Sequence, residues 1–245
     1  MKLSGHGEKY TRFEAKLKAL VYNDTMTIRS AVFVRGIVRE EDTIRDGIPQ
    51  LLFIGRSNVG KSSVINSFTN KKDLAISSST PGRTTQVNVF LINKNFYLVD
   101  LPGYGYARGS TQDRQRIADL ISWYVFSEHV EMRRVVLIVD VEVGLTETDL
   151  HMIKLLNEDN AEYIVLANKV DKIKGNELSK SIKKIKEHTG NHMVIPYSAK
   201  KGKGLSELTK ATLNGLSKVA KDDIPVELEM NRYPDIVIEE DEPLV

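Results

Sequence analysis

Gly55-Arg56-Ser57-Asn58-Val59-Gly60-Lys61-Ser62 decides the fold, because this stretch satisfies the pattern G-x-x-x-x-G-K-[ST]. Residues 51–54 before it have the apolar character of a buried strand, and residues 62–68 after it have the spacing of a helix. In that setting the glycines let backbone amides turn toward phosphate oxygens, and the helix adds its positive N-terminal end. Lys61 is expected to reach the β- and γ-phosphates, and Ser62 to ligate Mg²⁺. The stretch predicts a nucleoside triphosphate site.

Short apolar runs alternate with amphipathic stretches through most of the remaining chain. This alternation is typical of an α/β fold with a mostly parallel central sheet and helices on both faces, the P-loop GTPase architecture. The expected strands are residues 31–38, 51–54, 87–92, 96–99, 135–139, 164–167 and 193–196, and the expected helices are 62–68, 114–126, 146–158, 177–188 and 204–216.

Asn168-Lys169-Val170-Asp171 directly follows the expected strand 164–167 and bears on the choice of base. Ligands of open parallel sheets bind beyond the carboxyl ends of the strands. An Asp carboxylate there can accept hydrogen bonds from both the ring N1–H and the exocyclic amino group of guanine, whereas adenine offers no such pair. Ser198-Ala199-Lys200 follows the next strand in the same way. The order of these elements predicts a guanine site, although each short pattern alone would more often be a surface loop.

Asp100-Leu101-Pro102-Gly103 lies between these two ends and matches D-x-x-G. Asp100 would hold Mg²⁺ through water, and the Gly103 amide would meet the γ-phosphate, so that loss of this phosphate releases the following segment. Upstream, residues 77–85 form a polar, breaker-rich loop of the kind that a ligand orders. Thr84 is the preferred second hydroxyl on Mg²⁺ and Thr85 the competing one, because spacing does not separate them.

Composition sets the general class of the protein. A chain of 245 residues with 41% hydrophobic and 28% charged side chains suits one substantial domain with appendages. The absence of cysteine excludes disulfides and thiolate metal sites and fits a reducing compartment. We find neither a secretory signal nor an apolar run of about eighteen residues. A cytoplasmic monomer is therefore expected.

The net charge of +2 hides an asymmetry along the chain. Residues 222–245 hold nine acids and one arginine, a balance of −8, so residues 1–221 carry +10. A basic body favours a polyanionic partner such as RNA, while the simpler alternative is a well-solvated surface. The lysines concerned are Lys180, Lys183, Lys184 and Lys186 on one expected helix, and Lys200, Lys201 and Lys203 in a nearby loop.

Three regions follow from these patterns. Residues 1–28 are expected to form a helical extension, because residues 9–21 place apolar side chains at helical spacing. Residues 29–220 are the nucleotide-binding domain. Residues 221–245 combine three prolines with an acidic run and predict a flexible acidic tail.

Taken in order, the elements resemble the G1 to G5 motifs of the translation-factor-related GTPases. Residues 31–38, 46–49, 55–63, 79–84 and 100–107, the last reading DLPGYGYA, resemble more closely the EngB (YsxC) family of ribosome-biogenesis GTP-binding proteins. The resemblance extends over about residues 29–216. It implies a role in assembly of the large ribosomal subunit, with rRNA or a ribosomal protein as partner, and it assigns the G2 threonine to Thr84.

Hydrolysis is expected to be slow. In Ras-like proteins a glutamine just after D-x-x-G orients the attacking water, and here Tyr104 occupies that position. Relatives without the glutamine can use a potassium ion held partly by a phosphate-loop asparagine, and Asn58 stands at the matching place. One alternative is a nucleotide-sensing binding module with negligible hydrolysis. Another is a P-loop ATPase or nucleotide kinase, which Asn168 and Asp171 disfavour.

The predicted site comprises nucleotide contacts, catalytic groups and metal ligands. The catalytic groups are Lys61, Thr84, Gly103 and Asn58, and the Mg²⁺ ligands are Ser62, Thr84 and, through water, Asp100. The nucleotide contacts are Gly55, Arg56, Ser57, Asn58, Val59, Gly60, Lys61, Ser62, Gly82, Arg83, Thr84, Thr85, Gln86, Asp100, Leu101, Pro102, Gly103, Asn168, Lys169, Val170, Asp171, Ser198, Ala199 and Lys200.

Overall fold

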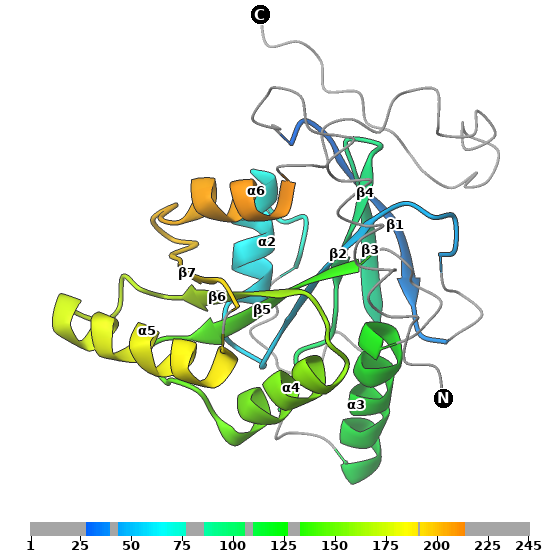
Figure 1. Ribbon diagram of the computed structural model, residues 1–245. Coiled ribbons are helices and arrows are strands. Elements are labelled where there is room, and N and C mark those ends of the chain that lie inside the picture. The colour runs from blue at the N-terminus through cyan, green and yellow to red at the C-terminus, as the bar shows by residue number, and fades with distance from the viewer. Residues whose placement is uncertain are drawn as a thin grey trace, which may run out of the picture.

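A computed structural model describes residues 28–39, 44–76, 86–105, 110–126, 133–190 and 192–213. The expected N-terminal helix, the loop 77–85 and the acidic tail lie outside these residues. Within them, strands and helices alternate along the chain (Figure 1). The elements are β1 (Ala31–Ile37), β2 (Gln50–Gly55), α2 (Lys61–Thr69), β3 (Val87–Ile92), β4 (Phe96–Asp100), α3 (Thr111–Phe126), β5 (Arg133–Asp140), α4 (Glu147–Glu158), β6 (Tyr163–Asn168), α5 (Gly175–Thr189), β7 (Val194–Pro196) and α6 (Leu205–Leu213).

The predicted α/β fold with a mostly parallel sheet is confirmed. The seven strands of the sheet have the order β1-β3-β4-β2-β5-β6-β7. β2 pairs in parallel with β4 and β5, and β6 pairs in parallel with β5 and β7. β3 runs antiparallel to both of its neighbours, β1 and β4. Every expected element of the described residues appears, with boundary shifts such as that of α3, which begins at Thr111 rather than at residue 114.

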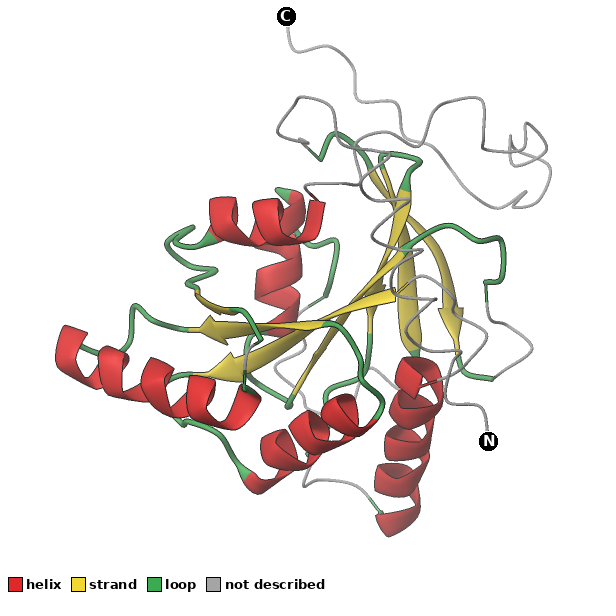
Figure 2. Cartoon of the chain, in the orientation of Figure 1, coloured by secondary structure: helices red, strands yellow, loops and turns green. Residues whose placement is uncertain are grey.

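Helices cover both faces of the sheet, as predicted (Figure 2). Side chains of α3, α4 and α5 share one core cluster with alternate residues of the central strands. Side chains of α2 and α6 share the second cluster with the other set. β2, β4 and β6 are buried along their whole length, which explains their nearly continuous apolar sequences.

The arrangement of the strands positions the site. Because β2, β4, β5, β6 and β7 run parallel, their carboxyl ends meet at one edge of the sheet. Four buried polar side chains lie at this edge, in contrast to the apolar core of the sheet: Asp100, Asp140, Asn168 and Ser198. Polar groups buried in this way need specific partners, and these partners define the candidate site.

Candidate functional site

The phosphate loop joins the end of β2 to the start of α2. Asn58 and Gly60 have φ values of 70° and 91°, so the loop passes twice through the left-handed region. A Cβ at Gly60 would lie 2.7 Å from Asn168 Nδ2, which excludes a side chain there. No side chain caps the N-terminus of α2 within the described residues, so its first amides remain available to an anion.

The lysine of the loop and the aspartate of D-x-x-G lie together. Lys61 Nζ donates a hydrogen bond to Asp100 Oδ1 at the end of β4, and the two groups form an ion pair. Both side chains are largely covered, with 11% and 5% exposure. The cation that neutralises phosphate charge therefore lies beside the acid that would hold a metal ion.

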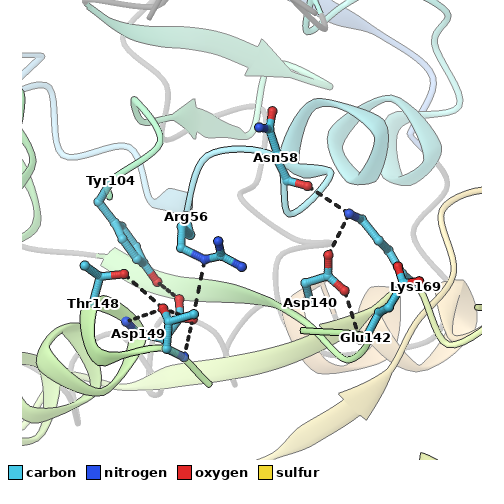
Figure 3. Close-up of polar contacts among 9 residues, drawn as sticks. Arg56, Asn58, Tyr104, Asp140, Glu142, Thr148, Asp149 and Lys169 are labelled. Carbon is cyan, nitrogen blue, oxygen red and sulfur yellow. Dashed lines mark hydrogen bonds and ion pairs between the residues drawn. The ribbon is translucent and has the colours of Figure 1, made fainter. Parts of the chain in front are cut away.

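The start of the N-K-x-D element is bonded to the phosphate loop. Asn168 Nδ2 donates to Val59 O at 2.8 Å. Lys169 Nζ lies 2.9 Å from Asn58 O and 2.6 Å from Asp140 Oδ2, a buried carboxylate at the end of β5 (Figure 3). Two side chains of one motif thus fix the shape of another that lies more than 100 residues away in sequence.

Asp171, the last residue of the N-K-x-D element, is exposed, and a hydrogen bond from the segment Ser198-Ala199-Lys200 orients its side chain. Ser198 Oγ donates to Asp171 Oδ1 at 2.5 Å and in turn accepts from Lys201 N at 3.1 Å. The Ser198 hydrogen bond lowers the pKa of the Asp171 carboxyl, so this group is ionised at neutral pH. An ionised carboxylate is the acceptor that the guanine N1–H and amino group require.

The end of the D-x-x-G element continues the sheet alongside the phosphate loop. Tyr104 N donates to Gly55 O at 3.2 Å, and Ser57 N donates to Tyr104 O at 2.9 Å. Gly103 lies so close that a Cβ on it would be 2.9 to 3.0 Å from Ser57 atoms. A glycine is therefore required at this position for the two loops to meet.

Known families match this chain over the same region. Residues 50–169 match the family described as 50S ribosome-binding GTPase, and residues 128–218 match the elongation factor Tu GTP binding domain. A probable GTP-binding protein EngB of Clostridium perfringens strain 13 is 42% identical over 186 residues, which are 75% of this chain and 94% of that relative. The chain belongs to the EngB family of GTP-binding proteins. Its nucleotide-binding domain is a GTPase domain, and the ATPase and kinase alternatives are set aside.

Other relatives agree with EngB membership. A probable EngB of Clostridium kluyveri is 39% identical over 189 residues, 76% of this chain and 95% of that protein. The crystal structure of a probable EngB has a TM-score of 0.56 and 29% identity, and the match covers 66% of this chain and 95% of that one. Era of Aquifex aeolicus, solved as a single-residue variant bound to GDP·AlF4⁻, has a TM-score of 0.57 and 25% identity, with 69% and 57% covered.

Several residues of this EngB chain that are predicted to contact the nucleotide can do so only through their backbone atoms. Another predicted contact residue lies apart from the phosphate loop. Val59, Leu101, Pro102 and Val170 have buried side chains. Gln86, directly before β3, donates from Nε2 to Asn88 Oδ1 at 2.9 Å, and its side chain lies against Gly36 of β1. The remaining predicted contacts of the upstream loop lie outside the described residues: Gly82, Arg83, Thr84 and Thr85.

Sequence reasoning missed two carboxylates. Asp140 is the counter-charge of Lys169, and Asp149 in the first turn of α4 accepts a hydrogen bond from the Tyr104 hydroxyl at 2.9 Å. Thr146 and Asp149 match the capping-box pattern, which would have predicted the helix start. No pattern in the sequence indicates the contact with Tyr104, because it joins residues 45 positions apart.

Proposed function

We propose that this EngB-family chain hydrolyses GTP slowly with Mg²⁺ and acts as a conformational switch in assembly of the large ribosomal subunit. The observation that carries the proposal is the convergence of the phosphate loop, Gly103, Asp171 and Ser198 at one edge of the sheet. Cytoplasmic location and a monomeric state belong to the proposal as well.

Mg²⁺ fits the chemistry of the residues around Lys61. Ser62 and Asp100 offer a hydroxyl and a carboxylate oxygen, which are the hard ligands that Mg²⁺ prefers. Among the described residues no three His, Asp or Glu side chains form a metal site by themselves. A bound Mg²⁺ would therefore depend on phosphate and water oxygens and on Thr84, with Thr85 as the alternative hydroxyl. The ion would neutralise the charge between the β- and γ-phosphates.

Gly103 would carry the response to the γ-phosphate. Its N–H donates to no group in the described part of the chain, whereas the neighbouring Tyr104 N–H already donates to Gly55 O. A free amide beside the phosphate loop can donate to a γ-phosphate oxygen, and it loses that acceptor when GTP becomes GDP. We expect the segment after Gly103 to change its position with hydrolysis.

Slow hydrolysis follows from the position of Tyr104. Its hydroxyl is buried and donates to Asp149, so it is not free to orient an attacking water. Burial raises the pKa of this hydroxyl well above its usual value, and the negative charge of Asp149 adds to the effect. The group remains a protonated donor at physiological pH. Lys61 can still stabilise the transferred phosphate, which supports hydrolysis at a low rate.

A ribosomal partner is supported by the charge of one side of the domain. Residues 169–213 contain eleven lysines and four acids. Lys183 and Lys186 lie beside a shallow groove of about 700 Å³ whose apolar residues are Leu178, Ile182 and Pro196. In the part of the chain that the structure describes, the lysines of α5 form no ion pair. Exposed, unpaired lysines on one helix suit an RNA backbone, and the matching family is described as ribosome-binding.

Phosphate release under multiple turnover tests the enzymatic part of the proposal. We expect GTP-dependent release that requires Mg²⁺ and stays slow, at roughly 10⁻⁴ to 10⁻² per second, the range of intrinsic GTPases. Guanine nucleotide binding with no measurable release would instead favour the alternative, a nucleotide-sensing binding module.

Cofractionation with large ribosomal subunits tests whether the lysines of α5 contact a ribosomal partner. The triple variant Lys183→Gln, Lys184→Gln and Lys186→Gln should bind less, and the log–log slope of its salt dependence should fall by about 0.7 to 0.9 for each phosphate that these lysines no longer neutralise. The matched control replaces Lys72, Lys94 and Lys154 on other elements by Gln, with the same change in charge. Equal weakening in both variants would show that net charge, and not the α5 surface, governs binding.

A further inference from the structure

Asp149 is a buried carboxylate with contacts on three elements. Its side chain is 1% exposed. Oδ2 accepts from Thr146 N at 3.0 Å, and Asp149 N donates to Thr146 Oγ1 at 3.4 Å; these two bonds form the capping box of α4. Oδ2 also accepts from Thr146 Oγ1 at 2.7 Å. Oδ1 accepts from the Tyr104 hydroxyl at 2.9 Å, and Arg56 Nε lies 3.8 Å from Oδ2 (Figure 3). A helix cap needs only the first pair of contacts, so Tyr104 and Arg56 require another explanation.

Arg56 depends on Asp149 for its counter-charge. The Nε atom of Arg56 is buried and forms no hydrogen bond in the described part of the chain, and Asp149 is the acid with which it forms an ion pair. Removing the charge of Asp149 would leave a buried guanidinium nitrogen uncompensated, which is unfavourable. Because Arg56 is the second residue of the phosphate loop, Asp149 thereby acts on this loop from α4.

Tyr104 links the same carboxylate to D-x-x-G. Its backbone is bonded to Gly55 and Ser57, while its side chain reaches α4. The next residue, Gly105, has a φ of 67°, and a Cβ there would lie 3.2 Å from Arg56 Cγ and from Thr148 Oγ1. The chain on both sides of Tyr104 is therefore closely confined, and Gly103 is held beside Ser57.

We propose that Asp149 is a positioning residue for recognition of the γ-phosphate: through Tyr104 and Arg56 it holds the Gly103 amide against the phosphate loop, and it thereby strengthens binding of GTP over GDP. The inference rests on the γ-phosphate contact of Gly103 proposed above. A donor that is already in place loses little conformational freedom when the ligand binds. GDP does not use this donor, so its affinity depends on Asp149 much less than that of GTP.

Tyr104→Phe and Asp149→Asn test the proposal through two affinities measured side by side. Fluorescent GDP and a non-hydrolysable GTP analogue are titrated into the full chain with Mg²⁺. Each variant should bind the GTP analogue about 5- to 10-fold more weakly, the net effect of one typical intramolecular hydrogen bond, and bind GDP within about 2-fold of the wild type. Tyr104→Phe removes one hydroxyl and keeps the helix cap, so it stays informative if Asp149→Asn unfolds.

Glu147→Gln is the matched control, because it removes an exposed carboxylate from the same helical turn. It should leave both affinities unchanged. The double variant Tyr104→Phe with Asp149→Asn should lose less than the product of the two single effects, since both act through one contact. Equal weakening of GDP and GTP analogue, or no change in either, would overturn the inference while the proposed function stands. A wild type that binds no guanine nucleotide would overturn both.

Discussion

The two ends of the nucleotide site are held in different ways. At the base end, Asn168 and Lys169 bond directly to phosphate-loop carbonyls at 2.8 and 2.9 Å. At the γ-phosphate end, Gly103 O accepts from Ser57 Oγ at 3.3 Å. The neighbouring Tyr104 adds a backbone bridge to the phosphate loop and a hydroxyl that reaches α4. We therefore expect the base end to select guanine without rearrangement, and the γ-phosphate end, which has few contacts to break, to change position on hydrolysis.

The charges at the two ends differ in a similar way. Lys169 has a permanent counter-charge in Asp140, which is buried at the end of β5. Lys61 pairs with Asp100, and both groups have further partners in the proposed mechanism, namely phosphate and Mg²⁺. In the proposed mechanism the base end keeps its ion pair when the nucleotide binds, while Lys61 and Asp100 exchange theirs for contacts with phosphate and Mg²⁺. Four variants or conditions can break or sharpen this contrast.

The largest effect is expected for Asp171→Asn. The amide cannot accept both guanine hydrogen bonds, so affinity for GDP and GTP should fall roughly 100-fold, as two bonds to a charged group are removed. Xanthine nucleotides, which carry an oxygen in place of the amino group, should gain affinity. Equilibrium titration with both nucleotide families measures this, and an unchanged preference for guanine would remove Asp171 from the base site.

Potassium should accelerate GTP hydrolysis roughly 10-fold over sodium, if Asn58 helps to hold a cation beside the transferred phosphate. The Asn58 carbonyl accepts from Lys169, while its side chain is exposed and makes no hydrogen bond within the described residues. Asn58→Gly removes this side chain and tolerates the φ of 70° at this position, so it should change nucleotide affinity little and abolish the difference between the two ions. Equal rates in potassium and sodium for the wild type would exclude the cation role.

Asp140→Asn should weaken GDP and the GTP analogue together, by about 5- to 10-fold, because Lys169 loses the partner that aims it at Asn58 O. The ratio of the two affinities should stay constant, in contrast to the variants of Tyr104 and Asp149. Glu142→Gln is a suitable control, since this neighbouring acid is exposed. A loss of affinity for the GTP analogue alone would contradict the assignment of Asp140 and Lys169 to the base end.

The smallest effect is expected for Ser198→Ala, at about 2- to 3-fold in guanine affinity at pH 7, because Asp171 stays ionised and loses only one exposed hydrogen bond that orients it. Because the Ser198 hydroxyl lowers the pKa of Asp171, guanine binding should persist at the usual Asp pKa of about 3.9 and be lost as the pH falls further, through the lowered pKa of Asp171. Removing the hydroxyl raises this pKa. The acid limit of binding should therefore move to higher pH, and an unmoved limit would contradict the assignment.

The fold and the nucleotide motifs could be predicted because their signals are local. A strand followed by a glycine-rich loop and a helix lies within 20 residues, and the elements after it repeat the same alternation. Order along the chain also fixes which motifs follow parallel strands, and such strands end at one edge of the sheet. This was enough to place Gly60 and Asn168 at the same edge from sequence alone.

The roles of Asp140 and Asp149 could not be predicted because the contacts that define them are not local in sequence. Asp140 and Asp149 look like an ordinary strand end and an ordinary helix cap in sequence. Their roles arise from packing: the register of β5 beside β6 places Asp140 next to Lys169, and α4 packs where Tyr104 leaves the sheet. The sequence places Tyr104 where Ras-like proteins have the glutamine. Its partner, Asp149, depends on a contact across the fold that no local pattern indicates.

Equilibrium binding of GDP, the GTP analogue and ATP to the wild-type chain with Mg²⁺ tests most directly that this sheet edge is a guanine nucleotide site. The account predicts guanine affinities in the micromolar range or tighter, with ATP at least about 100-fold weaker because adenine lacks the donor pair that Asp171 accepts. ATP binding as tight as GTP binding would contradict it.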